Sequence, residues 1–156
     1  MKKLFVVFTL LFAANLLTAK QLNVAIFYNQ YLNVNGQSYI ETYFSLDPRS
    51  VTLKLDQNNM WQGGLEILIT IEKENEIVAY DKVKLNATGS SDTISSIPYT
   101  VQQSRVKLDA GTYLMKIELT DINSTEEPIV LAQQIEVQLL LAALTLIVQL
   151  IRQFKT

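Results

Sequence analysis

A two-residue alternation of apolar and polar side chains is the feature that most constrains the fold of this chain. The alternation is clear from Leu65 to Glu72, after Gly111, and from Ile129 to Val137. Successive side chains of a β-strand point to opposite faces, so this period predicts strands with one face in a core. No helical period occurs between Gln21 and Val137. Seven or eight short strands at this spacing predict an immunoglobulin-like antiparallel β-sandwich.

The expected strands are separated by Gly, Pro, Asn and Asp turn signals. They cover residues 22–28, 39–46, 51–55, 65–72, 77–85, 97–101, 113–120 and 129–137. The Ser-, Thr- and Gly-rich stretch 86–96 is expected to form a loop, and Pro98 favours an edge position for the strand after it.

The sequence Asp109-x-Gly111-x-Tyr113 has the spacing of a tyrosine corner. In immunoglobulin-like sandwiches such a Tyr opens a strand and its hydroxyl binds nearby backbone. Gly111 suits this tight approach because glycine has no Cβ. An ordinary hairpin strand that begins after a glycine turn explains the same residues, so the sequence leaves both interpretations open.

The two ends of the chain differ from its centre. Lys2 and Lys3 precede an apolar run that ends in Ala19, which predicts a cleaved signal peptide over residues 1–19, with an uncleaved anchor as the alternative. The sandwich is then expected over residues 20–138. The tail, residues 139–156, contains the uncharged run Leu139 to Ile151. This run is short for a membrane span, so packing or burial by a partner is favoured over membrane contact.

Composition excludes several classes of function. The chain of 156 residues contains no histidine and no cysteine, so Ser-His-Asp catalysis, histidine metal sites and disulfides are impossible. The formal net charge of -2 argues against a broad nucleic-acid surface. No cofactor site is expected.

Carboxylates offer the remaining catalytic or metal-binding possibilities. An acid/base pair could be formed on one sheet face by Glu66, Glu72 and Glu118, but solvated outward positions explain these residues better. Oxygen ligands for Ca²⁺ could come from a second set, for which turn chemistry is the better explanation: Asp47, Asp56, Asn58 and Asn59. The chain is therefore expected not to be an enzyme.

Aromatic residues form the more informative candidate site. Tyr39 and Tyr43 share a predicted strand face with Glu41, and Trp61 follows soon after. Flat rings beside a carboxylate suit a protein interface or a stacked sugar. The alternative is a second buried face of the sandwich.

Several short motifs occur in a familiar order: Tyr39-Ile40-Glu41-Thr42-Tyr43, Tyr80-Asp81-Lys82 with Leu85, Gln103-Ser104-Arg105, Gly111-Thr112-Tyr113 and Asp121. This set resembles the N-terminal β-sandwich region of exported Bacteroidetes proteins that carry a Gly-Trp-x-Thr-Asp (GWxTD) domain. The resemblance covers roughly residues 22–137 and implies an all-β module outside the cytoplasm. The Gly-Trp-x-Thr-Asp motif itself is missing from this sequence. The tail is also richer in Leu than the resemblance implies, which suits a truncated or frame-shifted end.

These observations lead to one expected function and one alternative. We expect an exported, periplasmic or envelope β-sandwich module that acts through protein–protein contact. A carbohydrate-binding module that uses the surface aromatics is the alternative, and a membrane-tethered envelope protein is a further one.

Overall fold

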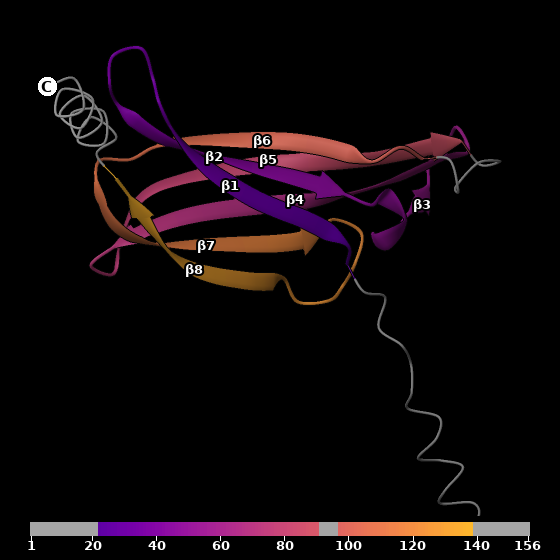
Figure 1. Ribbon diagram of the computed structural model, residues 1–156. Helices are drawn as coiled ribbons and strands as arrows, with labels where there is room; N and C mark the ends of the chain where they lie inside the picture. The colour runs from indigo at the N-terminus through magenta and orange to yellow at the C-terminus, as the bar shows by residue number, and fades with distance from the viewer. Residues whose placement is uncertain (1–21, 91–96, 139–156) are drawn as a thin grey trace, which may run out of the picture.

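A computed structural model describes residues 22–90 and 97–138 as two antiparallel β-sheets stacked face to face (Figure 1). The strands are β1 (Val24–Leu32), β2 (Ser38–Leu46), β3 (Lys54–Leu55), β4 (Met60–Lys73), β5 (Glu76–Ser90), β6 (Thr100–Lys107), β7 (Gly111–Asp121) and β8 (Ile129–Val137). One 3-10 turn, η1 (Pro48–Ser50), follows β2. The eight strands confirm the expected all-β sandwich.

The strand order is that of an immunoglobulin-like sandwich. One sheet has three strands in the order β1-β2-β6, and the other has the order β3-β4-β7-β8 with β5 paired to the free side of β4. The first, second and sixth strands therefore form one layer, while β4 and β7 form the centre of the other and β5 and β8 lie at its edges. A hydrogen bond from Ser104 Oγ on β6 to Asp81 on β5 (2.5 Å) joins the two layers on one lateral side.

The core lies between the inward faces of the two sheets. Its largest contributors alternate along β2, β4 and β7 as the period-two pattern requires: Ile40, Phe44, Leu46, Leu65, Ile67, Ile69, Ile71, Met115, Ile117 and Leu119. All of them are buried. Removal of this apolar area from water is the main stabilising term, and each fully buried aliphatic side chain contributes roughly 1.5–3 kcal/mol.

A tyrosine corner stands at the start of β7. The buried Tyr113 hydroxyl donates to the backbone carbonyl of Asp109 at 2.9 Å. Gly111, between them, has a φ of 155°, which L-residues with a side chain rarely adopt. Lys73, the last residue of β4, places its ammonium group 5.7 Å from the centre of the Tyr113 ring. The motif therefore ties the β6–β7 connection to the strand that follows it.

Several strands differ from the boundaries expected from sequence: β1 extends to Leu32, β3 is limited to Lys54–Leu55 and β4 begins at Met60, and the largest differences concern β5 and β6. The expected loop at 86–96 is wrong in its first part, because β5 continues to Ser90 and pairs with Met60 to Gly64 of β4. Ladder hydrogen bonds on β4 here outweigh the local preference of Ser, Thr and Gly for turns. The expected strand at 97–101 is displaced, since β6 begins at Thr100 and pairs with all but the first residue of β2.

The predicted signal peptide, residues 1–19, and the apolar tail, residues 139–156, lie outside the described residues. Among the described residues, no helix is long and apolar enough to cross a membrane.

Candidate interaction surface

The outer face of the three-stranded sheet gathers the aromatic residues that the sequence singled out. The register places Phe27, Tyr43 and Gln103 in one cross-strand row, and Tyr31, Tyr39 and Lys107 in another. Between these rows lies a third, which contains Asn29, Glu41 and Arg105. We call this set of outward side chains the aromatic face: Phe27, Tyr31, Tyr39, Tyr43, Glu41 and Arg105.

The aromatic rings of the face pair across β1 and β2. Phe27 stacks on Tyr43 with ring centroids 4.9 Å apart, and Tyr31 stacks on Tyr39 at 5.7 Å. Such cross-strand aromatic pairs stabilise a sheet and fix the orientation of the rings. About half of Phe27 and more than a third of Tyr31 nevertheless remain exposed. The face is therefore rigid and still accessible to a partner.

Glu41 is the polar centre of the aromatic face. Its side chain is only 7% exposed, although it points away from the core. The carboxylate accepts hydrogen bonds from the Tyr43 hydroxyl, from Arg105 Nε and, at 3.3 Å, from the amide of Gln103. The bond from Tyr43, followed by those from Arg105, lowers the pKa of Glu41, because each of them favours the ionised carboxylate. The same bond raises the pKa of Tyr43, which acts as the donor.

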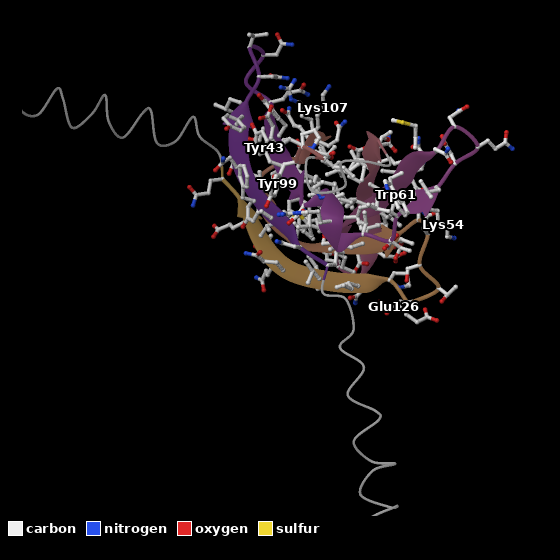
Figure 2. The ribbon with its side chains drawn as sticks, turned by 90° about the vertical axis from the view of Figure 1, so that its right-hand side faces the viewer. Tyr43, Lys54, Trp61, Tyr99, Lys107 and Glu126 are labelled. Carbon is white, nitrogen blue, oxygen red and sulfur yellow. The ribbon has the colours of Figure 1, made fainter. Side chains whose placement is uncertain are left out.

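The four residues predicted to contact a ligand or partner do not form one site. Tyr39, Glu41 and Tyr43 lie together on β2, whereas Trp61 lies at the start of β4 in the other sheet, paired with Leu55 and Gly89. Figure 2 shows Tyr43 and Trp61 on separate parts of the molecule. Trp61 is half-buried. The structure thus keeps the β2 residues as a group and separates Trp61 from them.

Sequence reasoning missed Phe27 and Arg105 as members of this surface. Phe27 looked like one more apolar residue of a strand that is apolar on both faces. Arg105 lies in a stretch, 102–107, to which no strand was assigned. The available signal was an alternation in which Ser104, Val106 and Leu108 are buried and their neighbours point outward. This signal is hard to recognise in the sequence because Ser104 is polar although it lies in the core.

Apart from Glu118, which lies opposite Leu68 and Val130 in the larger sheet, the other carboxylates considered from sequence take part in ion pairs or hold turns. Glu66 pairs with Lys82 at 2.7 Å and Glu72 with Lys116 at 2.6 Å on the outer side of the larger sheet. Asp56 accepts the backbone N–H groups of Asn58 and Met60, which closes a turn. These contacts lower the pKa of Asp56, the bond from Met60 most strongly.

Asp47 holds the turn after β2. Its carboxylate accepts three hydrogen bonds from Arg49, at 2.8 to 3.0 Å, and one from the Tyr99 hydroxyl at 3.4 Å. The contacts with Arg49 lower the pKa of Asp47 to about 2. In the part of the chain that the structure describes, no group of three or more acidic residues is arranged to hold a metal ion.

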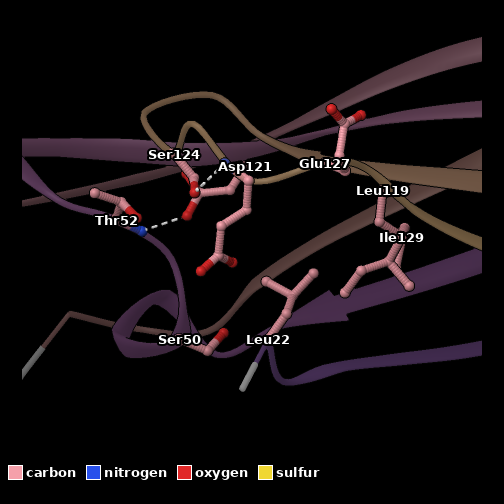
Figure 3. Close-up of a pocket in the computed structure, with 9 residues that line it drawn as sticks. Leu22, Ser50, Thr52, Leu119, Asp121, Ser124, Glu127 and Ile129 are labelled. Atoms are coloured by element: carbon pink, nitrogen blue, oxygen red, sulfur yellow. Dashed lines mark hydrogen bonds between the residues drawn. The ribbon is translucent and has the colours of Figure 1, made fainter. Parts of the chain in front are cut away.

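A small pocket lies at the end of the sandwich where β7 meets the loop before β8 (Figure 3). Its volume is about 90 Å³, well below the roughly 300 Å³ or more of ordinary ligand pockets. Asp121 in its wall accepts the backbone N–H of Thr52 at 2.6 Å and that of Asn123 at 3.0 Å. These hydrogen bonds anchor the neighbouring loops to β7, and the pocket beside them is smaller than an ordinary ligand site.

A larger open depression of about 500 Å³ lies between β5 and β6. Arg105 and Lys107 form one side of it, and Ile77 and Tyr80 form part of the other. Of the residues that line the depression, Arg105 alone also belongs to the aromatic face, so Ile77 and Tyr80 lie outside that face.

Comparison with models of known protein families finds no match, and a search of curated proteins finds no significant match.

Proposed function

We propose that this chain is an exported, non-enzymatic interaction module that binds a protein partner in the cell envelope through its aromatic face. The signal-peptide pattern at residues 1–19 supports export. The resemblance to the N-terminal region of exported GWxTD proteins agrees with it. The proposal assigns no catalytic step and no cofactor to the chain.

The observation that carries the proposal is the composition of a face that points away from the core. An outward face of a small antiparallel sheet is ordinarily polar and solvated. Here it bears stacked pairs of Phe and Tyr around a Glu41–Arg105 ion pair. Tyr and Arg are enriched among the residues that dominate binding energy at protein interfaces. Arg105 remains 64% exposed and can contact a partner while it is bound to Glu41.

Shape also favours a macromolecular partner over a small molecule. The aromatic face spans three cross-strand rows, and no deep cavity opens on it in the part of the chain that the structure describes. Flat surfaces of this kind suit protein contacts, whereas small ligands need concave sites that bury most of their area.

Quantitative affinity capture of the tagged full chain from its native envelope tests this proposal. The double variant Phe27→Ser/Tyr31→Ser removes exposed rings without touching the core. We expect it to lower recovery of a specific partner by about ten-fold or more, as loss of central interface aromatics does. The matched control, Ile77→Ser/Tyr80→Ser, removes side chains of β5 that are more exposed than Phe27 and Tyr31 but lie outside the aromatic face, and it should leave recovery unchanged. Equal recovery with both variants would reject the aromatic face.

Carbohydrate binding is the second candidate, favoured by the near-parallel rings beside a carboxylate. A glycan array probed with the wild-type chain, Tyr39→Ala and Trp61→Ala distinguishes the two functions. If the aromatic face binds sugar, Tyr39→Ala abolishes the signal and Trp61→Ala retains it, because Trp61 lies on the other sheet. If no glycan gives a signal, the carbohydrate-binding alternative is rejected.

A further inference from the structure

The two lateral sides of the sandwich differ in how their edge strands are protected. On one side lie β5 and β6, and on the other lie β1 and β8. The first pair carries many charged side chains: Glu76, Asp81, Lys82, Lys84, Arg105 and Lys107. By contrast, β1 has no charged residue and β8 has only Glu136. Charges on edge strands are a common protection against pairing with another chain.

The β8 edge combines unpaired backbone with exposed apolar side chains. Within the described residues β8 pairs with β7 alone, so alternate N–H and C=O groups along its other side have no ladder partner. Ile129, Val130 and Leu131 are 46%, 59% and 45% exposed. Pro128 precedes the strand and does not interrupt it. None of the usual devices against edge pairing is thus present from Ile129 to Leu131.

We propose that β8 pairs antiparallel with β8 of a second copy of this chain. A two-fold axis beside Val130 places Val130 opposite Val130 of the other copy, and Ile129 opposite its Leu131. It covers apolar side chains on both faces of the sheet, since Val130 points to the face opposite Ile129 and Leu131. The ladder then centres on the uncharged run Ile129 to Leu131, and Glu136 of each copy lies beyond its end.

A second copy fits this edge better than an unrelated strand because the edge is complementary to itself. An isologous contact needs one patch that matches its own rotated image. The β8 run meets this need with uncharged side chains and a regular ladder to β7 that has no bulge. The dimer forms through the larger sheet and leaves the aromatic face free, so failure of either proposal does not decide the other.

Disulfide trapping tests this pairing directly, because the chain contains no cysteine. Single cysteines are placed one at a time from Ile129 to Gln133 in the full chain, expressed with its leader so that processing takes place. Facing residues of antiparallel strands have Cα atoms about 4.5–5.5 Å apart, which suits a disulfide. We expect mild oxidation to give covalent dimers at one or two adjacent positions only. Cross-linking at none of them, or equally at all of them and at Val78→Cys on β5, would overturn the proposal.

Sedimentation equilibrium of two lysine variants provides an independent measurement. Val130→Lys places a charge where the two copies meet and should weaken the dimer by about ten-fold or more, as like charges facing each other do. Val78→Lys adds the same charge to the β5 edge, at a residue that is also half exposed, and should leave the dimer constant unchanged. Thermal melts by circular dichroism verify that both variants fold. A dimer that persists in folded Val130→Lys would overturn the proposal.

Discussion

At the scale of single residues, the tyrosine corner is the most sharply defined interaction in the structure. Tyr113 is 5% exposed and its hydroxyl bonds to the Asp109 carbonyl. We expect Tyr113→Phe to lower the free energy of unfolding by about 1 kcal/mol, because a buried carbonyl loses its donor. Denaturant unfolding measures this change, and Tyr80→Phe on the exposed surface of β5 is the matched control. A stability equal to that of the wild type would remove the corner from the forces that hold β7.

Two glycines test how backbone conformation and space contribute separately. A Cβ at Gly111 meets only ordinary contacts with Tyr113 and Lys73, so Gly111→Ala is opposed by its φ of 155° alone. Gly64 has nearly the same φ, 159°, and a Cβ there would in addition collide with the backbone carbonyl of Leu85 across the β4–β5 ladder. We expect Gly111→Ala to cost roughly 1 kcal/mol and Gly64→Ala clearly more, since backbone cannot move aside. Denaturant melts that rank the two variants in the reverse order would contradict this assignment.

At the scale of elements, Glu41 joins β2 to β6 on the aromatic face, and its pKa sets an acid dependence. The carboxyl pKa is lowered from its ordinary value of 4.5, first by Tyr43 and then by Arg105. A lowered folded-state pKa means that the stabilisation is complete above pH 4.5 and is lost as pH falls through the lowered value. The difference in unfolding free energy between wild type and Glu41→Gln should therefore shrink on acidification below pH 4.5.

Urea unfolding at a series of pH values measures this dependence. Asp47 also has a lowered pKa, but it is present in both proteins and cancels in the difference. Glu126→Gln, in the exposed loop before β8, is the control for the loss of one carboxyl group. A pH-independent difference for Glu41→Gln would show that the carboxylate does not stabilise the sheet through its charge.

Sequence predicted most elements because local alternation and burial agree in them. Aliphatic residues recur at every second position from Leu65 to Ile71, and the structure buries all four of these: Leu65, Ile67, Ile69 and Ile71. β6 was largely missed because Ser104 occupies an inward position, where the carboxylate of Asp81 satisfies its hydroxyl. No local pattern can reveal a hydrogen bond between residues on different strands. The extension of β5 likewise depends on a partner strand rather than on its own residues.

At the scale of the whole molecule, the candidate site depends on which sheet each strand joins. Tyr39, Glu41 and Tyr43 could be grouped from sequence because they share one strand face. Phe27 and Arg105 join them only through the β1-β2-β6 pairing, and Trp61 leaves the group because β4 belongs to the other sheet. The result is a sandwich with an aromatic outer face on one layer and, on the other, an edge strand, β8, whose one charged residue is Glu136.

The central claim is that the aromatic face contacts a protein partner, and site-specific photocross-linking in the native host tests it most directly. A photoreactive phenylalanine analogue replaces Phe27, whose ring is about half exposed, or Tyr80 on β5 as the control. We predict a discrete protein adduct from position 27, which mass spectrometry identifies, and none from position 80. Adducts from position 80 with none from position 27 would contradict the claim.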